Sequence, residues 1–175
     1  GKTDWYTRAA MKAGAVTGLT DKLGFVRAAS RWWMPFGERI AIIGGELVGL
    51  ELAEFLAARG RKVIVLDEAA KLGGGLQVVR RWRVLDELKE LGVILLPEAM
   101  DIAIGDRRIS YRNTLGQVRT IAADDIIVAQ GARADTGLAD RLRADGFIVH
   151  MAGDCTGVGY IEGAMHDAAE LAEAI

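Results

Sequence analysis

The stretch that decides the fold runs from Ile40 to Glu68 and reads IAIIGGELVGLELAEFLAARGRKVIVLDE. The apolar run at 40–43 predicts a strand that is buried on both faces. The glycine pair at 44–45 predicts a tight turn, and the following leucine-rich and alanine-rich residues predict a helix that stops at Gly60. A second apolar run, at 63–66, predicts another strand. The stretch therefore predicts a strand, a glycine turn, a helix and a parallel strand.

The residues around the glycine turn suit the binding of a pyrophosphate. Glu46, Leu47 and Val48 begin the predicted helix, where free backbone N–H groups and the positive end of the helix dipole attract an anion. Gly49 lets the helix lie close to the first strand. Asp67 ends the second strand, at the spacing of a dinucleotide-binding fold, where a carboxylate accepts hydrogen bonds from the ribose hydroxyl groups of adenosine.

Glu46 departs from the dinucleotide fingerprint. Laid from Gly44, the pattern G-x-G-x-x-G requires glycine at positions 46 and 49, and only Gly49 complies. An anion about 4 Å from a phosphate charge costs roughly 1 kcal/mol in water and about 4 kcal/mol at a protein surface. Two hypotheses follow: a working nucleotide site whose glutamate swings outward, and a degenerate nucleotide-binding or scaffold domain without redox activity.

The rest of the chain extends this unit into an α/β fold. Apolar runs at 93–96 and 126–129 predict two more parallel strands, and period-two alternation over 102–121 predicts an antiparallel meander between them. We therefore predict a Rossmann-like parallel sheet of strand order 3-2-1-4 with an antiparallel β-meander crossover. A third helix should bury one apolar face, made by Val78, Trp82, Leu85, Leu88 and Leu91.

The two ends of the chain are predicted to lie outside that fold. Residues 1–38 indicate a helical lead-in that ends near Trp32 and Trp33, which serve either as an apolar cover for the sheet or as a docking surface for a further domain. Residues 147–152 indicate a strand, a candidate fifth member of the sheet, and residues 161–175 indicate a final helix. The expected domains are 1–38, 39–145 and 146–175.

Composition excludes several classes of protein. The 175 residues are 51% hydrophobic with a net charge of −2, which indicates a globular chain without the basic patch of a nucleic-acid-binding protein. No apolar run has the length of a membrane span and no signal peptide opens the chain, so we expect a cytoplasmic location. Cys155 is the single cysteine, which excludes an internal disulfide. His150 and His166 show neither metal-ligand spacing nor a nucleophile partner, so no metal or catalytic residue is predicted.

Three motifs resemble a known family. GGELVGLELAEFL at 44–56, RRWRVL at 80–85 and GDCTGVGYIEGA at 153–164 are similar to the C-terminal part of 2,4-dienoyl-CoA reductase-like NADH:flavin oxidoreductases. These belong to the flavoproteins with two dinucleotide-binding domains, and the resemblance covers residues 36–175. In such enzymes hydride passes from nicotinamide to FAD, and electrons continue through an iron–sulfur cluster to FMN and the substrate.

The resemblance implies a role for each part of this chain. Residues 39–145 would form the NAD(P)H-binding domain, and 146–175 would supply the closing strand and helix of a split FAD-binding domain. The FMN barrel, the iron–sulfur cluster and the remaining FAD-domain portions would be partners in the same polypeptide, and this chain alone would be inactive. The implied cofactor-binding residues are Gly44, Gly45, Glu46, Leu47, Val48, Gly49, Asp67 and Glu68 at the nucleotide, Glu51 near the nicotinamide, Gln130 and Gly131 at the cleft, and Gly153 and Asp154 at FAD.

Cofactor preference follows from charge. Asp67 and Glu68 place two carboxylates where a ribose 2′-phosphate would lie, so NADH is favoured over NADPH. The nearby basic residues are Lys71, Arg80 and Arg81, and one of the arginines can reach a 2′-phosphate only if the intervening glycine loop permits it. A different Rossmann enzyme, such as a methyltransferase that binds S-adenosylmethionine, is a remoter alternative.

Overall fold

The structure, a computed structural model, describes residues 12, 24, 28–30, 34–131 and 133–174. The chain divides into two compact units, residues 1–130 and residues 131–175. Lys12, Gly24 and residues 28–30 are helical, and the rest of the predicted helical lead-in up to Trp33 lies outside the described residues.

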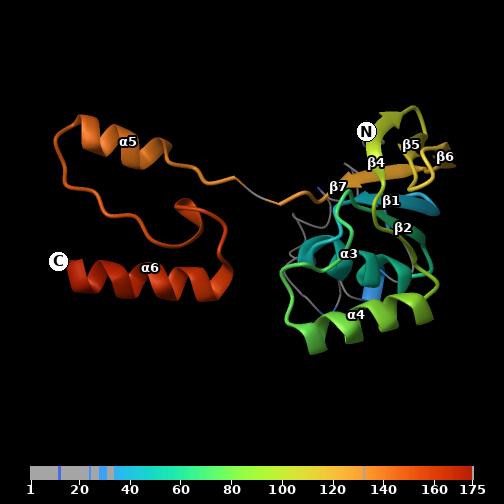
Figure 1. The fold of residues 1–175 in the computed structure, drawn as a ribbon, viewed down its shortest axis with the longest axis horizontal. Helices are drawn as coiled ribbons and strands as arrows, with labels where there is room; N and C mark the ends of the chain where they lie inside the picture. Colours follow the sequence, from blue (N-terminus) through green and yellow to red (C-terminus); the bar gives the residue numbers. More distant parts are fainter. Residues whose placement is uncertain (1–11, 13–23, 25–27, 31–33, 132, 175) are drawn as a thin grey trace. The chain divides into compact units, whose positions relative to one another are not determined.

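A four-stranded parallel sheet forms the centre of the first unit (Figure 1). Its strands are β1 (Arg39–Ile43), β2 (Lys62–Leu66), β3 (Ile94–Leu96) and β7 (Asp125–Val128), and their order is β3-β2-β1-β7. All neighbouring pairs run parallel. The predicted order 3-2-1-4 is confirmed.

Two helices cover one face of this sheet, α3 (Leu47–Ala57) and α4 (Val78–Glu90) (Figure 1). The alternate residues of β1 and β2 that point to this side are fully buried against helix residues such as Leu50, Leu56 and Leu88. Because side chains alternate along a strand, the intervening residues must be covered from the other face.

The predicted apolar face of α4 is partly wrong. Leu88 is buried and Leu85 packs against the core, but the side chains of Val78 and Trp82 are 68% and 71% exposed. The packed stripe consists of Val84, Leu85 and Leu88, so only the second half of the helix rests on the core. Periodicity identified the inward direction of the helix but not how far the sheet extends beneath it.

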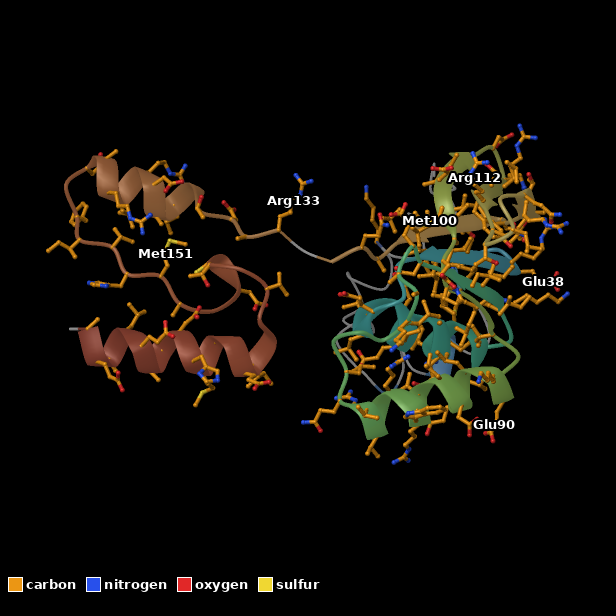
Figure 2. All side chains as sticks on the ribbon, in the orientation of Figure 1. Glu38, Glu90, Met100, Arg112, Arg133 and Met151 are labelled. Carbon is orange, nitrogen blue, oxygen red and sulfur yellow. The ribbon has the colours of Figure 1, made fainter. Side chains whose placement is uncertain are left out.

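An antiparallel meander covers the other face of the sheet. It consists of β4 (Met100–Gly105), β5 (Arg108–Arg112) and β6 (Val118–Ala122), and Met100 opposes Arg112 across its first hairpin (Figure 2). A second core cluster joins this meander to the parallel sheet, and its buried members are Ala41, Ile43, Leu66, Ala99, Ile109 and Ala123. The predicted meander is confirmed, and it replaces the helix that would otherwise close this face.

The second unit consists of α5 (Gly137–Ala144), the 3-10 turn η2 (Gly153–Cys155) and α6 (Tyr160–Ala174). The strand predicted at 147–152 is wrong, because these residues form no regular structure. A strand needs a neighbouring backbone to bond with, and the described residues from 133 to 174 contain no other strand. No helix in the described ranges combines the length and the apolar character that crossing a membrane requires.

Candidate nucleotide-binding site

The glycine turn after β1 is packed too closely for any side chain at its first position. Gly44 has a φ of +118°, and a Cβ built on it would lie 2.3 Å from the carbonyl oxygen of Ala129, the residue after β7. The Gly44 N–H donates to the carbonyl of Leu66 at 2.8 Å. The turn is therefore fixed between the ends of two neighbouring strands, and only glycine fits it.

Gly49 brings α3 against this turn. A Cβ built on Gly49 would lie 1.9 Å from the carbonyl oxygen of Gly44, well inside the closest approach that real Cβ atoms show. The helix thus starts directly on the turn, as the sequence predicted. This contact sets the direction of the first helical turn relative to the strand ends.

The first turn of α3 presents unpaired donors. The first hydrogen bond of the helix is donated by the Leu50 N–H to the carbonyl of Glu46, the N-cap residue, at 3.0 Å. In the part of the chain that the structure describes, the N–H groups of Glu46, Leu47 and Val48 have no acceptor. Such a group of N–H donors at a helix N-terminus suits a phosphate.

Glu46 occupies the cap without strain. Its backbone has φ −86° and ψ −174°, an extended conformation open to any residue, and its side chain makes no capping hydrogen bond. The glutamate is exposed rather than folded into the turn. The turn therefore accommodates glutamate at this position without backbone strain.

Asp67 lies beside the glycine turn, as its place at the end of β2 predicted. Its Oδ2 accepts the N–H of Gly45 at 2.5 Å, and its Oδ1 accepts the N–H of Ala69 at 2.8 Å. The residue is half-buried, whereas the neighbouring Glu68 is exposed. The sequence did not predict the bond from Gly45, because the two residues are 22 positions apart.

A second segment, Leu72 and Gly73, packs on the turn. The Leu72 side chain is buried against Gly45 so closely that a Cβ built on that glycine would overlap it, and the Gly73 N–H donates to the Gly45 carbonyl at 2.6 Å. The Arg81 Nε donates to the Leu72 carbonyl at 2.7 Å. Arg81 therefore braces this loop, a role that sequence reasoning missed.

The other predicted site residues are distributed over both units. Glu51 on α3 pairs with Arg80 on α4 at 3.2 Å, and both side chains are exposed. Gln130 follows β7, close in sequence to the Ala129 that contacts Gly44. Gly131, Gly153 and Asp154 belong to the second unit. The structure thus gathers Gly44 to Gly49 and Asp67 at one turn of the first unit.

In the second unit, η2 is tied to α6. The Gly153 N–H donates to Asp167 Oδ2 at 2.9 Å, and the Thr156 hydroxyl donates to the same oxygen at 2.7 Å. Asp154 Oδ1 accepts the N–H of Gly159 at 3.2 Å. These bonds give the Gly-Asp motif a defined conformation at the start of the last helix.

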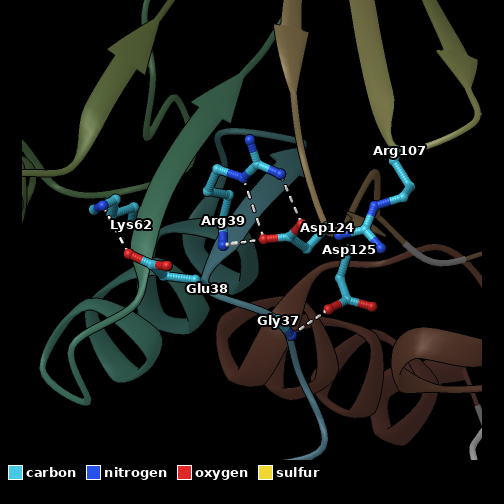
Figure 3. Close-up of polar contacts among 7 residues, drawn as sticks. All are labelled: Gly37, Glu38, Arg39, Lys62, Arg107, Asp124 and Asp125. Carbon is cyan, nitrogen blue, oxygen red and sulfur yellow. Dashed lines mark hydrogen bonds and ion pairs between the residues drawn. The ribbon is translucent and has the colours of Figure 1, made fainter.

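An ion-pair cluster anchors the start of β7 (Figure 3). At the other end of this strand, Ala129 packs on the glycine turn. Asp124 accepts hydrogen bonds from the Arg39 backbone N–H at 2.9 Å and from its Nη2 at 2.8 Å, and it also pairs with Arg107 of the meander. The bonds from Arg39 lower the pKa of the Asp124 carboxyl well below its ordinary value. Asp125 accepts the N–H of Gly37 at 2.6 Å.

In this cluster the two adjacent acids stand at the start of β7, and neither is fully exposed. The Asp124 side chain is only 13% exposed, because the two arginines enclose it. Asp124 fixes the start of β7 beside β1, and β7 in turn brings Ala129 to Gly44.

A cavity of about 430 Å³ lies at the opposite end of the sheet. Its lining comes from the amino ends of β1 and β2 and from the end of the meander, and includes Arg39, Lys62 and Ile121. None of the predicted site residues lines it. Ligands of parallel α/β sheets bind at the carboxyl ends of the strands, which is where the glycine turn lies.

The sequence profile of the pyridine nucleotide-disulphide oxidoreductases matches residues 9–166. The chain belongs to this family. A curated relative, the nitric oxide reductase FlRd-NAD(+) reductase of Salmonella agona, is 34% identical over 105 residues, which are 59% of this chain and 28% of the relative. The protein of the same name from an Enterobacter species is 30% identical over 109 residues. The chain thus spans less than a third of these relatives.

Solved structures support the same assignment. A 2-naphthoyl-CoA reductase in complex with 2-naphthoyl-CoA matches with a TM-score of 0.70 and 26% identity, over 75% of this chain and 20% of that one. A histamine dehydrogenase from Rhizobium sp. 4-9 shares the fold, with a TM-score of 0.69 and 19% identity, over 78% of this chain and 23% of that one. The chain is therefore a redox nucleotide-binding domain of a FAD- and NAD-binding oxidoreductase family, and the degenerate scaffold is not favoured.

Proposed function

We propose that this chain is the NAD(P)H-binding domain of a multidomain flavin-dependent oxidoreductase and presents the nucleotide for hydride transfer to FAD. The glycine turn carries this proposal: Gly44 and Gly49 bring the unpaired N–H groups of α3 to the carboxyl ends of β1 and β2. These donors suit the pyrophosphate of a dinucleotide. NAD(P)H would supply the hydride, and the residues of this chain would hold and orient it.

Asp67 and Glu51 would act at the two ends of the nucleotide. Each Asp67 oxygen already accepts one backbone N–H, and a carboxylate oxygen has a second lone pair that can accept a ribose hydroxyl. Glu51 lies one helical turn beyond the phosphate donors and, by the family resemblance, faces the nicotinamide. By the same resemblance, Gln130 and Gly131 would border the nucleotide cleft, while Gly153 and Asp154 would contact FAD.

NADH is the preferred cofactor in this proposal. Asp67 and Glu68 place negative charge at the ribose, and the two candidate arginines already have partners, Arg81 at the Leu72 carbonyl and Arg80 at Glu51. Repulsion of roughly 1–4 kcal/mol between a carboxylate and a 2′-phosphate corresponds to about five- to a thousandfold discrimination.

The complete enzyme would reduce an enoyl-type or dienoyl-type thioester. The motifs at 44–56, 80–85 and 153–164 support this substrate class through their resemblance to dienoyl-CoA reductases, and the similarity to a 2-naphthoyl-CoA reductase adds a second acyl-CoA enzyme. FAD would be shared with other portions of the polypeptide, and FMN and an iron–sulfur cluster would belong to its N-terminal barrel. This chain alone would bind nucleotide without completing the reaction.

Calorimetric titration of the chain with NADH, NADPH and ADP tests the proposal. We expect binding of NADH by the wild type, weaker binding of NADPH, and tighter binding of both by Glu46→Gly. Glu46→Gln is the matched control, because it removes the charge and keeps the side-chain volume. Binding of NADH by Glu46→Gly but not by the wild type would instead support the degenerate domain.

A further inference from the structure

Asp67 makes two hydrogen bonds that a ribose-binding role does not require. Its two carboxylate oxygens accept the N–H of Gly45, at 2.5 Å, and the N–H of Ala69, at 2.8 Å. The first bond connects the end of β2 to the glycine turn after β1, and the second closes a local turn after β2. One half-buried carboxylate therefore holds two loops together at the proposed phosphate site.

We propose that Asp67 is a positioning residue that orders the phosphate-binding turn, independently of any contact with ribose. This inference rests on the proposed nucleotide site. Glycine peptides are conformationally free, so the Gly44–Gly45 peptide needs outside restraints. The Leu66 carbonyl restrains the N–H of Gly44, and the Gly73 N–H restrains the carbonyl of Gly45. Asp67 supplies the remaining restraint, on the N–H of Gly45.

The bond determines which donors are left for a ligand. With the Gly45 N–H directed at Asp67, the N–H groups of Glu46, Leu47 and Val48 remain available in the described part of the chain. A charged acceptor holds a donor more firmly than a neutral one, and the half-buried position of Asp67 limits competition from water. Asp67 thus places an anion beside an anion site, and ordering and repulsion act there in opposite directions.

Ordering of the turn and charge repulsion change pyrophosphate affinity in opposite directions, and this difference provides the first test. The chain is titrated with inorganic pyrophosphate, a probe without ribose. If Asp67 contributes charge alone, its removal strengthens pyrophosphate binding. Ordering of the turn predicts that Asp67→Ala weakens it by about tenfold or more. Asp67→Asn keeps one acceptor oxygen, so its affinity for pyrophosphate should lie between those of Asp67→Ala and the wild type. The control Glu90→Gln removes an exposed charge at the end of α4, outside the proposed site, and should not weaken binding. Tighter pyrophosphate binding by Asp67→Ala would overturn the inference.

Amide hydrogen exchange provides the second test and needs no ligand. In Asp67→Ala the N–H groups of Gly45 and Ala69 should exchange about tenfold faster or more. The protection of the Ile42 amide in β1 should not change, and this control would show that the sheet remains folded. Unchanged exchange at Gly45 would refute the ordering role. If the wild type binds neither NADH nor pyrophosphate, the proposed function fails, whereas the exchange at Gly45 still decides whether Asp67 orders the turn.

Discussion

Replacing Gly49 by alanine should destabilise the first unit of the chain. The new Cβ would lie 1.9 Å from the Gly44 carbonyl oxygen, and real Cβ atoms essentially never approach closer than 3.0 Å, so the helix or the turn must shift. The atom in the way belongs to the backbone. Gly44 cannot yield easily, because the Leu66 carbonyl holds its N–H and the Ala129 carbonyl blocks its other side.

Two opposing effects determine how much stability the Gly49→Ala chain loses. Alanine is favoured over glycine in a helix interior by about 1 kcal/mol. Overpacking a rigid site costs about 1–3 kcal/mol, and the backbone contact at Gly49 places this case near the upper end. We therefore expect a net loss of about 2 kcal/mol in the free energy of unfolding.

Urea unfolding followed by tryptophan fluorescence measures this loss. The four tryptophans all precede residue 131 in the sequence, where the second unit begins, and Trp82 lies on α4 of the first unit. Gly74→Ala is the matched control, because its Cβ would meet no atom within 4 Å, and it should change stability by no more than about 0.5 kcal/mol. A Gly49→Ala chain as stable as the wild type would refute the packing described for the turn.

Three further predictions concern other parts of the structure. Arg39 lowers the pKa of Asp124 in the folded chain, so the charged carboxylate stabilises the fold above its ordinary pKa of 3.8. This stabilisation is lost as the pH falls further. Asp124→Asn should therefore flatten the pH dependence of stability at about pH 5 and below, as measured by fluorescence-monitored unfolding. Leu72→Ala should cost about 2–4 kcal/mol in the same urea assay, because Leu72 is buried, whereas the exposed Leu115→Ala should cost less than about 0.5 kcal/mol. The purified chain should show no flavin absorbance at one equivalent, since in the proposed function Asp154 and the start of α6 would supply only one edge of an FAD site.

The parts of the fold that could be predicted are those with a local signature. An apolar run, a glycine pair and a glycine-terminated helix define the β1–α3–β2 unit within one stretch of the sequence, and the crossover rule then places its strands. The meander was predictable because its alternation has a period that no helix shares. The strand predicted at 147–152 failed because an extended segment becomes a strand only beside another backbone.

The contacts that hold the site together could not be predicted, because they join residues far apart in the chain. Asp124 meets Arg39 across 85 positions, and nothing in two adjacent acids distinguishes an enclosed ion pair from a solvated end. Leu72 lies in a glycine-rich loop without any apolar pattern, yet its side chain is buried against Gly45. Burial of a single loop residue depends on the surface opposite it, which no local pattern describes.

The requirement for glycine in the turn separates into two physical causes. At Gly44 and Gly49 the cause is packing, since a Cβ at either position would overlap backbone carbonyl oxygens. Position 46 is different, because Glu46 is exposed and stands at the N-cap of α3 with an ordinary extended backbone. A glycine there would serve only the approach of a ligand. Any loss of nucleotide affinity caused by Glu46 therefore comes from charge and volume at the phosphates, and Glu46→Gly can relieve it without changing the packing that shapes the turn.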